Sequence, residues 1–302
     1  MRGLSGKFIK ELKSGLLNPI LSLVQKDSTL CLEIRENYIN VYYRGGNLLR
    51  IEQKNDSCTV HFEKKYIRED FGKLPSSQLT AYNNVEAWIA IIPFLKNEMD
   101  LWFGRHPKNE REFQQLMVRE NNFGNSAKST DYFICDIEYT QPNTNWRFDL
   151  VAINWPSTPS ARKNNKNLRL SFIEMKYLDH ALTEKNTGIN KHIRDMNGFL
   201  ELPSNLLNIK NEMKTLFNQK LELGLIDNKK PIESFGDQKP EYIFVFANHD
   251  PESNILKREM KKLLDCPNAE LKFGVSTFMG YGLYGQNIYS QNSFLERFEN
   301  QI

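Results

Sequence analysis

The sequence predicts an α/β fold with a mixed central sheet, and three observations lead to that prediction. The chain has 302 residues, 40% hydrophobic and 25% charged, which is enough to bury one large core or two smaller ones. Residues 31–67 alternate between apolar and polar. From Asn109 onward, helical and strand-like segments follow one another in the order α-β-β-β-α-α-β-α-β. Three strands joined by turns, then strands separated by helices, favour a mixed sheet flanked by helices.

The first 75 residues predict a small β-rich module. Residues 8–24 read as short helices, broken near Gly15 and Pro19. Residues 31–67 alternate and are rich in β-branched and aromatic side chains, with a glycine-containing hairpin turn at residues 44–47. We therefore expect an antiparallel meander here. A Pro- and Ser-containing stretch then predicts a boundary, giving a module over 1–75 for recognition of a substrate or partner and an α/β domain over 76–302.

The remaining elements follow from periodicity. Apolar positions at i, i+3 and i+4 predict helices, and apolar runs of four to ten residues predict strands. The expected helices span 84–103 (bent at Pro93), 109–122, 189–200, 204–223 and 254–265, and the expected strands span 131–139, 146–155, 168–177, 241–248 and 269–279. A polar, basic linker occupies 156–167.

Composition excludes some classes of protein. The 40 basic and 37 acidic residues give a formal charge of +3, which is too small to identify a partner. The four cysteines are scattered without metal-ligand spacing, which favours thiols in a reducing compartment. No apolar stretch approaches the roughly 20 residues that a membrane span needs, and charges interrupt the N-terminus before a secretory signal can form. We expect a cytoplasmic protein that does not enter a membrane.

Two charged positions interrupt the predicted third strand, and a third interrupts the strand before it. Asp149 lies within the apolar segment WRFDLVAINW, and Glu174 and Lys176 lie within LRLSFIEMKY. Side chains two apart on a strand share a face, so Glu174 and Lys176 point the same way. If the two strands pair, Asp149 joins them at the centre of the sheet.

Charges buried in a sheet need compensation, since an unpaired buried charge costs several kcal/mol or more. One solution is an internal ion pair. The other is a divalent cation held by Asp149 and Glu174, with the carbonyl of Met175 directed at the same place. Hard oxygen ligands suit Mg²⁺ or Mn²⁺. Lys176 would then orient a water molecule or help to take its proton.

Asp149 and the Glu174-Met175-Lys176 triplet, 174 − 149 = 25 positions later, resemble the signature of the PD-(D/E)XK nuclease superfamily. The resemblance covers about Asn109 to Val275 and implies a restriction-endonuclease-like αβββαβ core. It also implies a two-carboxylate Mg²⁺ site that hydrolyses phosphodiester bonds, in DNA because the superfamily mostly acts on DNA. Here Phe148 precedes Asp149, where the signature has proline. Many members lack that proline.

The resemblance also points to supporting residues. The first core helix often adds an acid, for which Glu112 is the best match and Glu110 the alternative, and the helix after the lysine often adds a polar or basic residue, for which Lys191 and His192 are candidates. Many such nucleases act as dimers, so a homodimer is compatible with it. Separately, the basic linker offers Arg162 and Lys163 as contacts for a phosphate backbone, and Lys191 and His192 are further candidates for contacts with nucleic acid.

Two other interpretations remain open at the level of sequence. The chain could be a catalytically inactive binding or interaction protein that keeps the nuclease fold. It could also be a structural protein in which Glu174 and Lys176 pair with each other or with Asp149. Zinc-binding HxxxH spacing, a GxSxG elbow and a P-loop do not occur, and the GxGxxG letters at 280–285 precede a poor helix start.

Overall fold

The computed structural model describes residues 2–54, 57–79, 84–141, 144, 146–183, 188–228, 230–249, 254–276, 282–283 and 285–299. The chain forms two compact units. The first comprises Met1–Gln115 and Thr215–Ile226, and the second comprises Leu116–Lys214 and Asp227–Ile302. The sequence boundary predicted at 75/76 differs from this division, which falls within two helices instead, α4 (Asn109–Asn122) and α8 (Pro203–Glu222).

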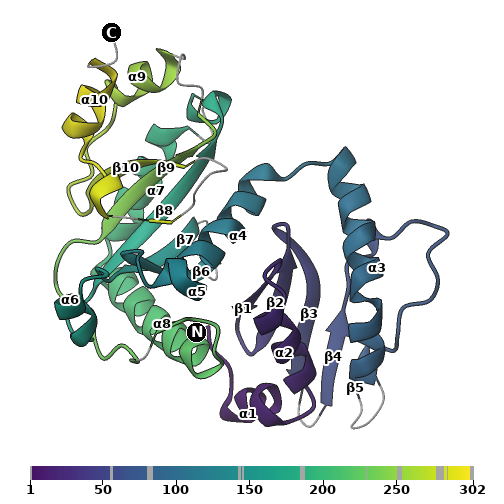
Figure 1. Cartoon of the computed structure of the whole chain (residues 1–302). Coiled ribbons are helices and arrows are strands. Elements are labelled where there is room, and N and C mark those ends of the chain that lie inside the picture. Colours follow the sequence, from purple (N-terminus) through teal and green to yellow (C-terminus); the bar gives the residue numbers. More distant parts are fainter. Residues whose placement is uncertain are drawn as a thin grey trace. The chain divides into compact units, whose positions relative to one another are not determined.

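The first unit is built on a five-stranded antiparallel sheet with the order β1-β2-β3-β4-β5 (Figure 1, purple to blue). Its complete helices and strands are α1 (Gly6–Ser14), α2 (Asn18–Lys26), β1 (Leu30–Ile34), β2 (Tyr38–Tyr43), β3 (Gly46–Lys54), β4 (Ser57–His61), the 3-10 turn η1 (Lys64–Tyr66), β5 (Gln78–Leu79) and α3 (Asn84–Arg105). The predicted meander is confirmed, because β1 to β4 pair in sequence order. The predicted helix over 84–103 is confirmed as α3, and Pro93 lies inside it.

The turn between β2 and β3 requires glycine. Arg44 and Gly45 both have positive φ, 48° and 72°. The Gly45 amide donates to Gln115 Oε1 at 2.7 Å. A Cβ at this position would lie 2.4 Å from the carbonyl carbon of Arg111, which is closer than real contacts allow. The hairpin tip therefore packs directly against the backbone of the first part of α4.

An ion pair is buried in the first unit. Lys220, on the second half of α8, is 1% exposed, and its Nζ lies 2.8 Å and 2.7 Å from the two carboxylate oxygens of Glu33 on β1. Glu33 is fully buried. This pair is one of the contacts that join residues 215–226 to the first 115 residues, and each charge needs the other once both have left water.

The second unit is built on a five-stranded mixed sheet with the order β10-β9-β8-β7-β6 (Figure 1, teal to yellow). Its complete elements are α5 (Gly124–Ala127), β6 (Tyr132–Thr140), β7 (Arg147–Asn154), α6 (Pro159–Lys163), β8 (Arg169–Tyr177), η2 (Asp179–Leu182), α7 (Ile189–Leu200), β9 (Glu241–Ala247), α9 (Asn254–Met260), β10 (Glu270–Ser276), η3 (Gly285–Asn287) and α10 (Gln291–Glu299). β6, β7 and β8 pair antiparallel, and β8, β9 and β10 pair parallel. The predicted mixed sheet and element order are confirmed, with the short helices α5, α6 and α10 as additions.

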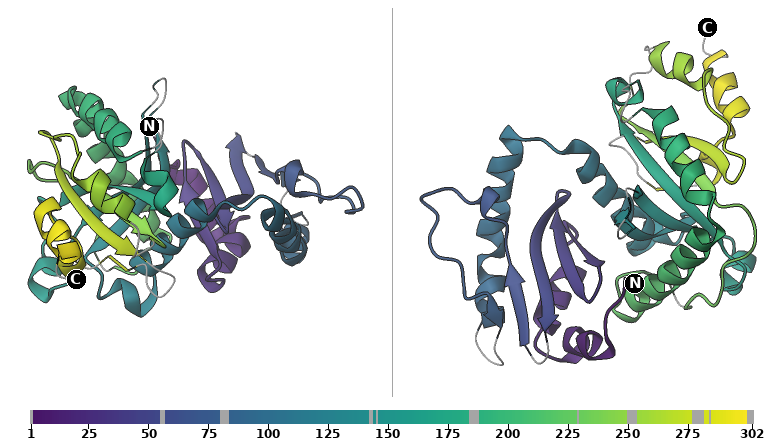
Figure 2. Two further views of the ribbon diagram at one scale, coloured as in Figure 1. Left: turned by 90° about the horizontal axis from the view of Figure 1, so that it is seen from above. Right: turned by 180° about the vertical axis from the view of Figure 1, so that it is seen from behind.

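One face of this sheet is covered by α7 and α10 (Figure 2). The ring of Phe199, on α7, lies 5.8 Å from that of Phe172, on β8. The ring of Phe294, on α10, lies 6.0 Å from that of Phe273, on β10. By strand alternation and register, Glu174 and Lys176 lie on this same face, because they follow Phe172 by two and four residues.

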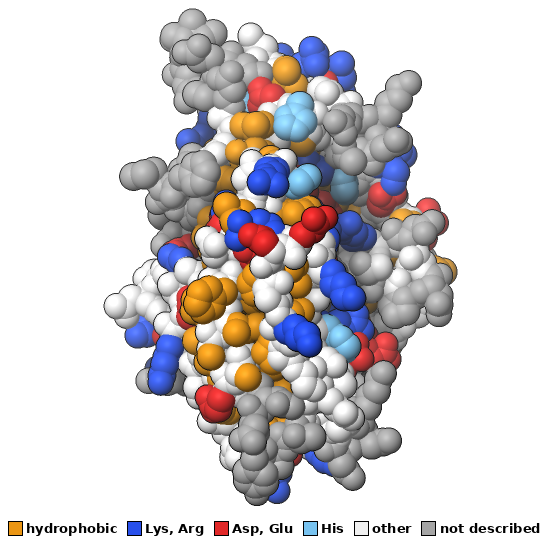
Figure 3. All heavy atoms as spheres, turned by 90° about the vertical axis from the view of Figure 1, so that its right-hand side faces the viewer, with side chains coloured by type: hydrophobic (Ala, Val, Ile, Leu, Met, Phe, Trp, Pro, Cys, Tyr) orange, Lys and Arg blue, Asp and Glu red, His pale blue; other side chains and the backbone are white. Residues whose placement is uncertain are grey.

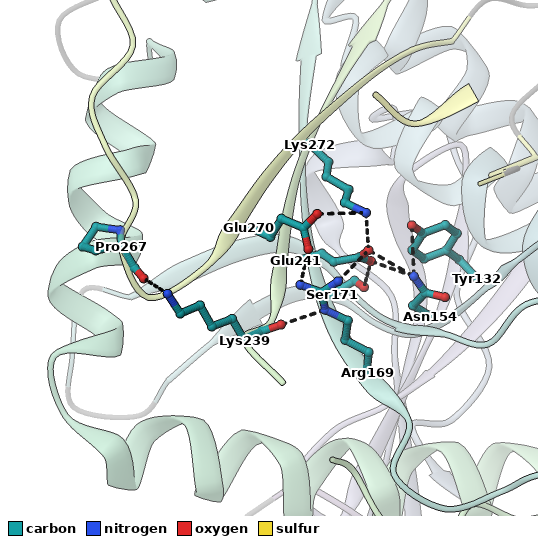
Figure 4. Close-up of polar contacts among 9 residues, drawn as sticks. All are labelled: Tyr132, Asn154, Arg169, Ser171, Lys239, Glu241, Pro267, Glu270 and Lys272. Carbon is teal, nitrogen blue, oxygen red and sulfur yellow. Dashed lines mark hydrogen bonds and ion pairs between the residues drawn. The ribbon is translucent and has the colours of Figure 1, made fainter. Parts of the chain in front are cut away.

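The opposite face carries a second buried carboxylate, Glu241, at the start of β9 (Figure 4). Its oxygens accept hydrogen bonds from Ser171 Oγ at 2.7 Å and Asn154 Nδ2 at 3.1 Å. Lys272 Nζ lies 3.0 Å from it, and Arg169 Nη1 lies 3.5 Å from it. Glu241 is thus neutralised entirely by its own unit, as a structural buried acid must be.

On each outermost strand of the second sheet, β6 and β10, one residue already makes backbone hydrogen bonds to a segment outside the sheet. On β6, the Asn122 side chain accepts from the Ile134 N–H and donates to the Ile134 carbonyl, each at 2.8 Å. On β10, the backbone of Phe273 exchanges two hydrogen bonds with that of Tyr289, at 2.9 Å and 2.8 Å. These contacts use backbone groups that face away from the neighbouring strand.

Helix α3 presents apolar side chains to solvent. Phe94 is 64% exposed and Leu101 is 41% exposed, and a spacing of seven places them on one side of the helix. The space-filling view of the side on which α3 lies shows hydrophobic side chains gathered in one region (Figure 3). Among the helices that the structure describes, none is long and apolar enough to cross a membrane.

Candidate active site

The candidate site lies where β7 and β8 stop pairing. Their ladder runs from Asn154–Arg169 to Leu150–Ile173. Asp149 and Glu174 are the next residue on each strand beyond that last registered pair. The two acids that sequence analysis singled out are therefore neighbours across adjacent antiparallel strands.

Asp149 bridges to the backbone of the other strand. Its Oδ2 accepts a hydrogen bond from the Met175 N–H at 3.0 Å, and the residue is 7% exposed. This contact places a carboxylate against the middle of the Glu174-Met175-Lys176 triplet. It satisfies a backbone donor that β7 no longer pairs with at this point.

Glu174 is buried beneath α7. The residue is 1% exposed, and its Oε2 lies 3.3 Å from His192 Nδ1. His192 was predicted as a contact for nucleic acid, and the structure brings it to the carboxylate itself. Its side chain is 21% exposed, so it lies between the buried acid and the solvent.

Lys176 is a buried amine on the same face. It is 4% exposed, and no carboxylate of the described residues lies within the 4.0 Å of its Nζ that defines an ion pair. The geometry gives no support to the structural interpretation, in which Lys176 pairs with Glu174 or Asp149. A buried ammonium without an anion is costly, so an anion from outside the protein would find a favourable position here.

The pKa of Tyr242, on β9, is affected by both acids. Tyr242 is the registered neighbour of Phe172 and is 1% exposed. Burial raises the pKa of Tyr242 well above its ordinary value, and the negative charges of Glu174 and Asp149 raise the pKa further. Both carboxylates therefore act on the same region of this face.

The two acids are of the ligand type that a hard cation prefers. Asp149 and Glu174 offer carboxylate oxygens on two adjacent strands, and Asp149 reaches the backbone of Met175. Within the described part of the chain, no group of three or more His, Cys, Asp or Glu side chains could hold a metal ion. Mg²⁺ is commonly bound by one or two carboxylates, with water and substrate phosphate completing its shell, so two acids suffice for it.

Glu112 has a different partner from the one that sequence analysis implied. It belongs to the first unit, where its carboxylate oxygens lie 2.9 Å from Nε and 3.2 Å from Nη2 of Arg44. Asp100 Oδ1 lies 2.8 Å from Arg44 Nη1 as well. Glu112 thus holds the β2–β3 turn, and Glu110, the alternative, belongs to the same unit.

Arg162 and Lys163 lie at the far end of the β7–β8 hairpin. They belong to α6, in the loop that joins Asn154 to Arg169, and Arg169 precedes Glu174 by five residues, or about 17 Å along the strand. The guanidinium of Arg162 lies 4.3 Å from the centroid of the Phe133 ring, and burial lowers the pKa of Arg162 to about 10. Arg162 anchors this loop, whereas Lys163 is exposed.

Lys191 is committed to an ion pair on the surface of α7. Its Nζ contacts the carboxylate of Asp195 one turn later, and both side chains are 37% exposed. Of the supporting residues that sequence analysis proposed, the structure therefore brings His192 and Met175 to the two acids. The ion pair of Lys191 is of the helical i, i+4 type, which contributes a few tenths of a kcal/mol.

Sequence reasoning did not identify Tyr242, nor a histidine–aspartate pair in the same unit. His249 Nδ1 lies 2.6 Å from Asp179 Oδ1. His249 follows β9 and Asp179 follows β8, so both lie at the carboxyl ends of parallel strands. Ligands of open α/β sheets bind at such ends, which is the signal that could have found the pair.

Comparisons of the chain with family models, with curated proteins and with solved structures found no match.

Proposed function

We propose that the second unit is a Mg²⁺-dependent nuclease of the PD-(D/E)XK type that hydrolyses phosphodiester bonds in DNA. The observation that carries the proposal is the Asp149 carboxylate on the Met175 N–H, with buried Glu174 and buried Lys176 on either side; Lys176 has no carboxylate partner among the described residues. The element order α4-β6-β7-β8-α7-β9 agrees with the αβββαβ order that the resemblance implies. That agreement supports a restriction-endonuclease-like core.

In this proposal, each charged residue has a separate task. Asp149, Glu174 and the Met175 carbonyl would hold Mg²⁺, which when bound polarises a phosphate oxygen and lowers the pKa of a water molecule. Lys176 orients the attacking water and stabilises the negative charge that develops on the phosphate. The Met175 N–H holds Asp149 in place. His192 holds the Glu174 carboxylate at the base of α7.

The first test is cleavage of plasmid, single-stranded DNA and RNA by the full chain with Mg²⁺, with Mn²⁺ and with a chelator. Asp149→Asn keeps an oxygen for the Met175 N–H and removes the charge, and Lys176→Met keeps the length of the side chain. We expect each variant to lose at least about a hundredfold in cleavage rate. Lys239→Met is the control, because Lys239 Nζ donates to the Pro267 carbonyl outside the site.

Calorimetry with Mn²⁺ separates metal binding from turnover. The parent chain should bind the ion, and Asp149→Asn should bind it much more weakly. Lys176→Met should retain binding, since an ammonium is not a ligand. Equal Mn²⁺ binding by the parent and by Asp149→Asn would remove Asp149 from the metal site.

A second candidate function is that of a nuclease-fold protein that binds nucleic acid without cutting it. One observation favours it: both acids already lie close to groups of the protein, since Asp149 accepts a hydrogen bond from the Met175 N–H and Glu174 Oε2 lies 3.3 Å from His192 Nδ1. In this case the parent chain would bind DNA without metal and cleave none of the three substrates. The same experiments therefore decide between the two candidates.

A further inference from the structure

The carboxyl ends of β8 and β9 bring a histidine and an aspartate together. His249 Nδ1 lies 2.6 Å from Asp179 Oδ1, and their side chains are 7% and 14% exposed. A carboxylate only accepts hydrogen bonds, so Nδ1 carries the proton of this contact, and the second ring nitrogen, Nε2, is itself buried. This is the arrangement by which an acid fixes the tautomer and orientation of a catalytic imidazole.

A residue with positive φ precedes each member of the pair. Leu178, directly before Asp179, has a φ of 59°, and Asn248, directly before His249, has a φ of 50°. Leucine rarely adopts this left-handed conformation, which costs on the order of 1–3 kcal/mol and concentrates at functional sites. The two turns are tied by the hydrogen bond from the Leu178 N–H to the Ala247 carbonyl, at 3.0 Å. The fold thus holds both side chains in place at an energetic cost.

The pair lies at the same end of the sheet as Lys176. Lys176 is registered with Phe246 on the neighbouring parallel strand. Asp179 follows Lys176 by three residues, and His249 follows Phe246 by three residues. Three residues of chain span at most about 11 Å, so Asp179 and His249 each follow within that reach of the registered pair Lys176 and Phe246, at the same end of the sheet.

We propose that His249 is the general acid of the phosphodiester hydrolysis, protonating the leaving oxygen, and that Asp179 is its positioning residue. The inference rests on the proposed function and adds a catalytic group to it. As water oxygen bonds to phosphorus, the bond to the leaving oxygen breaks and its electron pair stays on that oxygen. The proton on His249 Nε2 passes to this oxygen, and the proton of the attacking water leaves to solvent beside Lys176.

The test replaces the leaving oxygen by sulfur. A thiolate leaves without being protonated, so a general acid is dispensable for a substrate with sulfur at the bridging position. We measure cleavage of one oligonucleotide at fixed Mg²⁺ with oxygen, with 3′-bridging sulfur and with 5′-bridging sulfur. His249→Ala should slow the oxygen substrate by about 10²- to 10⁴-fold and one of the sulfur substrates by less than about tenfold. Asp179→Asn should cause a smaller loss, again confined to the oxygen substrate.

His180→Ala is the matched control, since His180 is exposed and next to Asp179 in sequence. It should cleave every substrate like the parent. Thermal unfolding and Mn²⁺ calorimetry should be unchanged in the histidine variants, and if His249→Ala does not fold, His249→Gln is judged by the same criterion.

Two results would overturn the inference while leaving the proposed nuclease in place: a His249 variant that cleaves the oxygen substrate as fast as the parent, or one slowed equally on all three substrates. A parent chain that cleaves no substrate would overturn both.

Discussion

Position 45, in the turn between β2 and β3, accepts only glycine. Its φ is 72°, and only 2.4 Å would separate an added Cβ from the carbonyl carbon of Arg111, so no side chain fits. We predict that Gly45→Ala lowers the free energy of unfolding by about 1–3 kcal/mol, measured by urea denaturation. Gly6→Ala is the control, because nothing lies within 4 Å of a Cβ at that helix position. Equal effects of the two substitutions would contradict this account of the turn.

The hydroxyl of Tyr43 should lose its proton at a higher pH than an ordinary tyrosine. Burial raises its pKa, and its hydroxyl contact with Asp100, 2.9 Å from Oδ2, raises the pKa further, to about 12. Because the pKa in the folded protein exceeds the ordinary value of 10.0, the stabilisation is complete below pH 10 and is lost as pH rises through 12. A tyrosinate absorbance titration of the parent, compared with Tyr43→Phe, should show one group missing near pH 12. Asp100→Asn should move that group downward.

At this scale, sequence reasoning found charges but could not find their partners. Asp149, Glu174 and Lys176 could be identified because charges are rare inside apolar strands. The ion pair between Arg44 and Glu112 joins residues 68 positions apart. No local pattern encodes such a contact. From the sequence alone, Glu112 was predicted to support the catalytic acids Asp149 and Glu174. The contact between His192 and Glu174 likewise depends on where α7 lies on the sheet.

Among the elements, α3 holds the segment after η1 through one buried acid. Glu98 is 2% exposed, and Arg68 donates to it from its backbone N–H at 3.0 Å and from Nη2 at 2.8 Å. These hydrogen bonds from Arg68 lower the pKa of Glu98 below its ordinary 4.5. A lowered pKa means stabilisation that is present above about pH 4.5 and lost as pH falls through the value of the folded protein.

We therefore predict that Arg68→Met lowers the thermal midpoint more at pH 7 than at pH 3, because the stabilisation that depends on a lowered pKa of Glu98 decreases as pH falls below 4.5. Calorimetric scans at both pH values check this. Arg105→Met, at the exposed end of the same helix, is the control and should show no such difference. An equal loss at both pH values would mean that Arg68 stabilises the segment by packing alone.

The long elements could be predicted because their periodicity is strong. α3, α7 and the strands β6 to β9 lie close to their expected ranges. The short helices α5, α6 and α10 were not predicted, since a helix of four to nine residues depends on its contacts more than on its own sequence. The order of strands in the second sheet also lay beyond prediction. Parallel pairing of β8 with β9 joins segments about 70 residues apart in sequence, as in the contact between Ser171 and Glu241.

For the whole molecule, the units are assembled from segments that are distant in the chain. A fragment of residues 76–302 would contain Lys220 without Glu33, its partner at 2.7 Å. The fragment also lacks β1 to β4, so the segment 215–226, with the buried side chains of Leu216 and Phe217, would lose much of the unit to which it belongs. We predict that this fragment unfolds at markedly lower temperature than the full chain, measured by circular dichroism. A fragment with the midpoint and cooperativity of the full chain would show that 75/76 is a true boundary.

The predicted boundary rested on a local change in composition near Pro75. The observed division depends on contacts that composition does not report, such as that between Lys220 and Glu33, which are 187 positions apart. Each helix that crosses the division, α4 and α8, looks in sequence like an ordinary element of one domain. This is why the elements could be read from the sequence and their grouping could not.

The covered edges of the second sheet bear on how the protein behaves at high concentration. A bare edge strand is a template on which a strand of another molecule can grow, and this is how sheets spread into aggregates. Here the Asn122 amide and the Tyr289 backbone already occupy Ile134 and Phe273, one on each outermost strand. An incoming chain would have to displace these contacts before it could pair with either outermost strand at those positions.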